Sequence, residues 1–226
     1  MGALILSPRL EKVADFITYK TVADIGTDHG KLLIYLAQKK NLQKGIGSDV
    51  AKGPADACRK NVQTFGLTDT IEIRVGDGLK TLMPTDAETV VVAGMGGELI
   101  AKILAACPDV VRSVKEFVLQ PMTNSDKLLK ALPELGIKVT DGALVQEGDK
   151  LYRIYKCEQG VSNLSDFETI ICPAFKGEPL LEMLIEKEKT KAQKKLLGMQ
   201  SGKADAEAEC EKLRTLIKEL DSYEIK

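Results

Sequence analysis

Short runs rich in β-branched residues alternate with helical stretches along residues 1–158, and this rhythm constrains the fold more than any other feature. Parallel strands need a crossover connection, usually a helix, so the alternation predicts an α/β protein whose parallel sheet carries helices on both faces. The predicted strands are Thr21–Ile25, Gly45–Asp49, Ile71–Val75, Thr89–Ala93 and Glu116–Gln120. The predicted helices are Arg9–Ile17, capped by Ser7 and opened by Pro8, then Lys31–Lys39, Lys52–Phe65, Glu98–Cys107 and Ser125–Leu132.

The rhythm changes after the fifth strand. Lys138–Val145 and Leu151–Cys157 read as two strands joined by the turn Gln146–Lys150, which predicts an antiparallel hairpin. A parallel sheet that ends in such a hairpin is unlike a plain dinucleotide-binding fold. It is the seven-stranded arrangement of the Rossmann-like methyltransferases, and we expect that sheet here.

Residues 159–226 have a different composition and are expected to form a second, helical domain after the first domain of residues 1–158. Two helical stretches, Leu180–Met199 and Ala204–Tyr223, are separated by Ser201-Gly202. Apolar residues in the second stretch recur at alternating spacings of four and three, as in a coiled-coil seam. These residues are Ala206, Cys210, Leu213, Ile217 and Leu220. We predict a coiled-coil-like helical hairpin, giving a monomer or a weak dimer.

Composition excludes several classes of protein. The five cysteines are scattered and His29 is the only histidine, so no zinc-type ligand cluster is expected. No apolar run approaches the roughly 18 residues that cross a bilayer, and the first residues lack a signal-peptide pattern. We therefore expect a cytoplasmic protein without metal or membrane attachment.

The net charge of −1 gives no global attraction to nucleic acid, but lysines gather locally. Residues 187–203 hold six lysines against one acid, Glu188. Such a patch can bind phosphates, and a solvated helix face explains it equally well. The candidate phosphate-binding residues are Lys187, Lys191, Lys194 and Lys195.

The turn after the first strand reads Asp24-Ile25-Gly26-Thr27-Asp28-His29-Gly30. Glycines there let a cofactor approach the backbone, and the following helix offers free N–H groups. A dinucleotide fingerprint needs a second glycine where this chain has Asp28, whose charge would oppose a pyrophosphate. S-adenosylmethionine has no phosphate and carries a sulfonium and an amino group, so the turn favours that cofactor.

Two further acids follow the next strands. Asp49 ends the second strand and is placed to accept the ribose hydroxyls of a nucleoside cofactor. Asp77, in Gly76-Asp77-Gly78, is placed to accept the exocyclic amine of an adenine. Any one of these acids alone is more simply a loop or cap residue. Together with the strand rhythm and the hairpin, they favour a cofactor crevice at the carboxyl ends of the strands.

The fourth strand ends in Ala93-Gly94-Met95-Gly96-Gly97. Three glycines around a methionine predict a flat backbone floor with free N–H groups. A plain glycine-rich turn is the alternative, but three glycines cost folding entropy without an evident structural need.

With these motifs in view, residues 1–158 resemble the bacterial tRNA (adenine-22-N1)-methyltransferase family, often called TrmK. The matching segments are Ser7-Pro8-Arg9-Leu10, the turn from Ala23 to His29, Gly53-Pro54, Gly76-Asp77-Gly78-Leu79, Ala93 to Gly97, Leu119-Gln120-Pro121 and Lys150-Leu151-Tyr152. The resemblance implies S-adenosylmethionine as cofactor and N1 of adenine 22 in tRNA as the target. The implied cofactor-binding residues are Arg9, Asp24, Gly26, Asp28, His29, Asp49, Asp77, Gly78, Ala93, Gly94 and Met95. The implied substrate side holds Gly96, Gly97, Gln120 and Pro121, with the lysines of the hairpin.

This chain departs from the family pattern at three places. It has Gly30-Lys31-Leu32-Leu33 where the family usually has a small residue followed by Tyr-Leu-Pro. It has Asp49 in place of the usual glutamate, and Met122 in place of an asparagine. The first and third departures concern the substrate side.

Adenine N1 has a free lone pair at neutral pH, so methylation there needs mostly alignment. Because the product ring is cationic, a carboxylate near N6 would stabilise it, and Asp28 is the candidate catalytic residue, with His29 orienting it or contacting the cofactor. N1 lies on the pairing edge, so the base must be unpaired or flipped onto the glycine floor. The alternatives are a methyltransferase of another RNA base or a small molecule, a non-catalytic RNA-binding protein, and, last, an NAD-dependent dehydrogenase.

Overall fold

The computed structural model describes residues 4–199 and 206–223. Its centre is a seven-stranded sheet in the order β3-β2-β1-β4-β5-β7-β6. The strands are β1 Thr21–Ile25, β2 Lys44–Asp49, β3 Ile71–Val75, β4 Thr89–Gly96, β5 Glu116–Thr123, β6 Ile137–Glu147 and β7 Lys150–Gln159. β1 to β5 are parallel, and β7 is antiparallel to both β5 and β6. The predicted Rossmann-like methyltransferase sheet is therefore confirmed.

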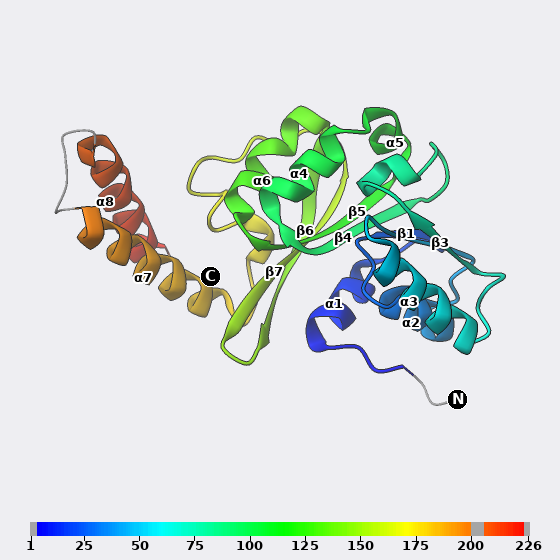
Figure 1. Cartoon of the computed structure of the whole chain (residues 1–226). Helices are drawn as coiled ribbons and strands as arrows, with labels where there is room; N and C mark the ends of the chain where they lie inside the picture. Colours follow the sequence, from blue (N-terminus) through cyan, green and yellow to red (C-terminus); the bar gives the residue numbers. More distant parts are fainter. Residues whose placement is uncertain (1–3, 200–205, 224–226) are drawn as a thin grey trace.

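Helices cover both faces of this sheet (Figure 1). The helices are α1 Pro8–Phe16, α2 Lys31–Lys39, α3 Lys52–Thr64, α4 Gly97–Ala105, α5 Pro108–Ser113 and α6 Ser125–Ala131. One hydrophobic cluster joins the sheet to α1, α2 and α3, and a second joins it to α4, α5 and α6. Because strand side chains alternate between faces, Val22 enters the first cluster while Ala23 and Ile25 enter the second.

The strand and helix predictions hold to within a few residues, with three differences. β4 and β5 continue to Gly96 and Thr123, past an irregular register that sequence periodicity does not reveal. Helix α5 was not predicted, because six residues are too few for a helical period, although Pro108 is a usual first helical residue. Ser7 does occupy the cap position of α1, but its side chain makes no capping hydrogen bond.

The predicted hairpin is β6–β7, and its turn is shorter than expected. Glu147 already pairs with Lys150, so Gly148 and Asp149 alone make the turn. Gly148 has a φ of 57°, which a residue with a side chain adopts only at a cost. This tight turn lets the two strands stay paired to their tip.

The C-terminal part begins with a loop and the 3-10 helix η3, Pro173–Phe175, whose Phe175 ring packs 5.3 Å from that of Tyr155 on β7. Helices α7 Leu181–Met199 and α8 Ala206–Ser222 then pack together and project from the sheet (Figure 1). Cys210, Leu213 and Leu220 of the predicted seam are buried. The predicted turn Ser201-Gly202 and Lys203 lie outside the described residues.

The base of this helical pair is not separate from the main core. Leu181, Leu184 and Leu220 belong to the same cluster as the α4–α6 face of the sheet, and the Phe167 and Tyr223 rings lie 5.6 Å apart. The sheet itself ends at Gln159. The division into domains of residues 1–158 and 159–226 therefore stays a prediction.

Candidate functional site

The carboxyl ends of β1 to β5 meet at one edge of the sheet, and the loops that follow them line that edge. Asp24 is the penultimate residue of β1, Asp49 is the last residue of β2, and Asp77 precedes the 3-10 helix η1, Gly78–Thr81, after β3. The backbone N–H groups of Gly26 and Thr27 donate to the Ser48 carbonyl at 2.8 and 2.9 Å, which ties the first turn to β2. The three acids that the sequence singled out thus lie on successive strands of one edge.

The turn from β1 to α2 requires its glycines. Gly26 has a φ of 76°, and a Cβ atom there would lie 2.1 Å from Cε of Met95, which reaches over the turn from β4. Gly30 has a φ of 68°, and a Cβ atom there would lie 2.7 Å from Sγ of the buried Cys58. The turn is therefore a narrow backbone cradle between β1 and β4.

Buried polar groups lie under this cradle. Asp24 is only 7% exposed, and burial raises the pKa of its carboxyl to about 6, against the lowering effect of a Thr27 hydrogen bond and with a smaller raising effect of the Asp28 charge. Within the described residues, the buried hydroxyl of Ser48 has no hydrogen-bond partner. Buried polar groups without partners are unusual in folded proteins, so this region is suited to a polar or cationic ligand.

Asp28, the candidate catalytic residue, is exposed rather than buried. Its side chain is 78% accessible, with His29 Nε2 at 3.3 Å and Lys31 Nζ at 3.9 Å from its carboxylate oxygens. His29 has a φ of 57°, and its carbonyl accepts a hydrogen bond from Asn61 at 3.0 Å. The carboxylate therefore faces outward, where a substrate could reach it, and His29 lies within its reach.

Asp49 and Asp77 differ in their surroundings. Asp49 accepts a hydrogen bond from the Ala51 N–H at 2.8 Å. Asp77 forms an exposed ion pair with Lys80 at 2.6 Å, which engages its Oδ2 atom. Val50, which directly follows Asp49, is 73% exposed.

The glycines after β4 do not share one role. Gly94 has a φ of 82°, is exposed, and donates its N–H to Gln120 Oε1 at 3.0 Å. Gly96 lies partly open beside Thr123, where a Cβ atom would be 3.3 Å from the Thr123 hydroxyl. Gly97 is buried, and a Cβ atom there would lie 2.2 Å from the Asn124 carbonyl. The expectation that these glycines lack a structural need is therefore wrong for Gly94, whose φ favours glycine, and for Gly97, which must let α4 pack against the turn after β5.

Arg9 brings a positive charge to this edge from α1. Its Nη1 atom donates to Oε1 of the fully buried Gln120 at 2.5 Å, and the same oxygen accepts the Gly94 N–H. Gln120 in turn donates to the Pro121 carbonyl at 3.0 Å. The half-buried guanidinium forms no ion pair with any residue in the described part of the chain. A partly desolvated cation without a carboxylate partner points to an anionic ligand group.

Two more residues hold Arg9, and sequence reasoning gave neither a role. Glu147 Oε1 accepts the Arg9 backbone N–H at 2.6 Å. The Tyr152 ring lies 5.3 Å from the guanidinium carbon. Glu147 is 138 residues from Arg9 in sequence, so only the folded hairpin reveals this contact.

The predicted phosphate-binding lysines lie on α7. Lys195 pairs with Glu209 of α8 at 2.6 Å, and Lys191 lies 3.6 Å from Glu188. Lys187 donates to the Asp149 carbonyl at 3.2 Å, and Lys194 is exposed. Lys187, Lys191 and Lys194 share one face of the helix by their spacing, whereas Lys195 is engaged between the two helices.

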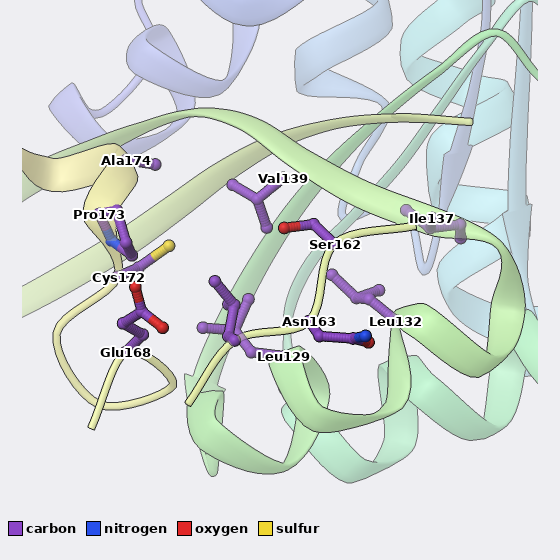
Figure 2. Close-up of a pocket in the computed structure, with 11 residues that line it drawn as sticks. Leu129, Leu132, Ile137, Val139, Ser162, Asn163, Glu168, Cys172, Pro173 and Ala174 are labelled. Carbon is purple, nitrogen blue, oxygen red and sulfur yellow. The ribbon is translucent and has the colours of Figure 1, made fainter. Parts of the chain in front are cut away.

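A cavity of ≈ 230 Å³ lies elsewhere, between α6, the start of β6 and the loop of residues 162–174 (Figure 2). Its wall includes Leu129, Val139, Glu168 and Cys172. None of the predicted site residues lines it. Because ligands of open α/β sheets bind at the carboxyl ends of the strands, we assign the site to the loop edge and not to this cavity.

Within residues 4–199 and 206–223, no cluster of three or more histidine, cysteine, aspartate or glutamate side chains is arranged to hold a metal ion. No helix in the described part of the chain is both long and apolar enough to span a bilayer.

The sheet order, the glycine cradle and the acidic strand ends define a methyltransferase of the Rossmann-like class, and residues 6–155 match the family described as a methyltransferase domain. The chain belongs to the tRNA (adenine(22)-N(1))-methyltransferase family. It is 33% identical to the Bacillus subtilis protein of that name over 161 residues, which are 71% of this chain and 68% of that protein.

Solved structures agree with this assignment over nearly the whole chain. The B. subtilis m1A22 tRNA methyltransferase TrmK is 25% identical, with a TM-score of 0.88 over 96% of this chain and 98% of that one. A Streptococcus pneumoniae protein, described as a candidate tRNA (m1A22) methyltransferase and solved in complex with S-adenosyl-L-methionine, is 28% identical. Its TM-score is 0.84, again over 96% and 98% of the two chains.

Proposed function

We propose that this protein transfers a methyl group from S-adenosylmethionine to N1 of adenine 22 in tRNA. The half-buried guanidinium of Arg9, without an acidic partner among the described residues, is the observation that carries the cofactor assignment. It supplies a cation for the carboxylate of the cofactor's methionine part. The family relationship supports tRNA as the acceptor.

The residues at the loop edge suit the remaining parts of the cofactor. The cradle at Gly26 leaves the backbone open, and the buried Asp24 would face the positively charged amino group and sulfonium. Asp49 would accept the ribose hydroxyls, and the exposed Val50 would pack against the adenine ring. Asp77 Oδ1, opposite the oxygen that Lys80 engages, would accept the adenine amine. When bound, the cofactor supplies an electrophilic methyl group.

The residues of this chain mainly orient the target base and the cofactor and stabilise the charge that develops in the reaction. Asp28 is exposed at the mouth of the crevice, so its carboxylate can face the exocyclic amine of the target base and stabilise the cationic ring or accept its proton. Gly94 and Gly96 leave room beside Gln120 and Pro121 for an unpaired base. His29, at 3.3 Å, would hold Asp28 in place.

Lys187, Lys191 and Lys194 on α7 would bind tRNA phosphates away from the crevice. Lys195 would contribute less, because Glu209 already engages its ammonium group. The free, scattered cysteines support the cytoplasm as the location. The protein would act as a monomer or as a weak dimer through the helical pair.

Calorimetry with S-adenosylmethionine and with NAD tests the cofactor, and only the first is expected to bind. Incubation with methyl-labelled S-adenosylmethionine and bulk tRNA, followed by digestion to nucleosides, tests the reaction. The label is expected in 1-methyladenosine. Label in another nucleoside would indicate a different RNA base, and RNA binding without transfer would indicate a non-catalytic protein.

A further inference from the structure

The tip of the β6–β7 hairpin lies between α1 and α7 (Figure 1). Side chains alternate along β7, so its two faces meet different partners. Ile154 belongs to the cluster that includes α1, while Tyr155 belongs to the cluster that includes the start of α7. Tyr152 shares the face of Ile154, and Arg153 shares the face of Tyr155. The hairpin is therefore the element that contacts both helices.

On the α1 side, the hairpin holds Arg9 by both its backbone and its side chain. Glu147 Oε1 accepts the Arg9 N–H at 2.6 Å, at the N-terminal turn of α1, where N–H groups lack helical partners. A carboxylate is also favoured at this positive end of a helix. Tyr152 presents its ring to the guanidinium at 5.3 Å, an attractive cation–π distance.

On the α7 side, two contacts fix the same tip. Arg153 donates to Glu188 at 2.6 Å, and the two side chains are only 12% and 17% exposed. Lys187 donates to the carbonyl of Asp149 in the turn itself, at 3.2 Å. A largely buried, hydrogen-bonded ion pair is shielded from solvent, so it restrains the hairpin more firmly than a surface pair.

We propose that Glu147 and Tyr152 are positioning residues for Arg9, and that α7 maintains this arrangement through Glu188. The proposal rests on the proposed function, since Arg9 is taken to bind the cofactor's carboxylate. It also links the helix that carries the phosphate-binding lysines to the crevice. Any effect of tRNA bound on α7 on cofactor affinity at Arg9 would be matched by an equal effect of the cofactor on tRNA affinity, because coupling between two binding sites is reciprocal.

If Glu147 and Tyr152 served only to stabilise the fold, their loss would weaken binding of every part of the cofactor alike. Two ligands separate these explanations. S-adenosylhomocysteine contains the amino-acid carboxylate that Arg9 would bind, whereas 5′-methylthioadenosine has the same nucleoside and thioether without it. Loss of Arg9 positioning should weaken the first ligand only.

The test is calorimetry of both ligands on the full chain. Tyr152→Leu and Glu147→Ala should each weaken S-adenosylhomocysteine about five- to tenfold, the size of one lost cation–π or charge-assisted contact, and leave 5′-methylthioadenosine unchanged. Tyr152→Phe and Glu147→Gln, which keep the ring and the acceptor, should bind nearly as the parent does. Glu188→Ala should give a smaller loss than either, and Glu186→Ala, an exposed acid on the same helix, should give none.

Equal loss of both ligands, or no loss in Tyr152→Leu and Glu147→Ala, would overturn the proposal. If Glu186→Ala lost as much S-adenosylhomocysteine affinity as Glu188→Ala, α7 would have no specific role in positioning Arg9. If the parent protein bound neither ligand, the proposed function itself would be wrong. If Tyr152→Leu folds poorly, the Glu147 variants still decide the test. The affinity for S-adenosylhomocysteine relative to 5′-methylthioadenosine is then compared between Glu147→Ala and Glu147→Gln.

Discussion

A Cβ atom at Gly26 would lie 2.1 Å from Cε of Met95, so a side chain at residue 26 would force the Met95 side chain away from its place over the turn after β1. The φ of 76° at Gly26 adds a second restriction, since residues with a side chain pay to adopt it. The narrow cradle of the candidate crevice depends on this pair of residues.

Gly26→Ala should therefore destabilise the protein by about 1–2 kcal/mol and displace Met95 from its place over the turn, which should weaken S-adenosylmethionine binding. Chemical denaturation and calorimetry measure the two effects. Gly53→Ala is the matched control, because nothing lies within 4 Å of a Cβ atom there and the residue is in helix α3. Equal behaviour of the two variants would contradict the cradle.

Asp24 should make stability depend on pH in an unusual direction. Burial raises the pKa of this carboxyl from 3.8 to about 6, so the folded protein holds its proton to higher pH than the unfolded chain does. The stability that this proton gives is complete below about pH 4 and is lost as the pH rises through about 6. Asp24→Asn should raise the free energy of unfolding by about 1–3 kcal/mol at pH 7.5 and by little at pH 4.

Urea denaturation of parent and variant at both pH values measures this difference, since contributions of other groups cancel in the subtraction. Asp69→Asn, at an exposed residue, is the control and should show no pH-dependent gain. A gain in Asp24→Asn that is the same at both pH values would mean that the carboxyl titrates normally.

Asp28→Ala should lower the turnover number about a hundredfold or more while S-adenosylmethionine binding is largely kept. The reason is that the exposed carboxylate is assigned to the target base and not to the cofactor's buried parts. Steady-state methyl transfer and calorimetry separate the two. Asp69→Ala is the control, because it removes an exposed acid to which no role in the site is assigned, and this variant should be active. Full activity of Asp28→Ala would remove this residue from the reaction.

Replacing Lys187, Lys191 and Lys194 together with glutamate should weaken tRNA binding and flatten its salt dependence. Filter binding at several salt concentrations gives both the affinity and the slope. The control replaces Lys20, Lys39 and Lys60, which are exposed on other parts of the chain, and so makes the same change in net charge. If both triple variants lose the same affinity, the effect is only one of overall charge.

Much of the fold could be predicted because its causes are local. The alternation of strands and helices requires a parallel sheet, and β1, β3 and α2 have the predicted bounds. The strand-end acids follow from that prediction, since each comes directly at or after a predicted strand.

The rest depends on contacts between distant residues. Ser7 is a residue type that commonly caps helices, but its side chain makes no capping hydrogen bond. The Arg9 N–H in the first turn of α1 donates instead to Glu147, 138 residues further along the chain. Arg9 itself was assigned only through the family resemblance, because an arginine in a helix carries no local signal of its partner. Nothing in the local sequence reveals the structural need for Gly97, because the group that a Cβ atom there would meet is the carbonyl of the distant Asn124.

The most direct test of the central claim uses two tRNA transcripts that differ only at position 22, one with adenine and one with guanine. With S-adenosylmethionine, the protein should place one methyl group per molecule on the adenine transcript, recovered as 1-methyladenosine at position 22, and none on the other. Equal methylation of both transcripts, or none of either, would contradict the account.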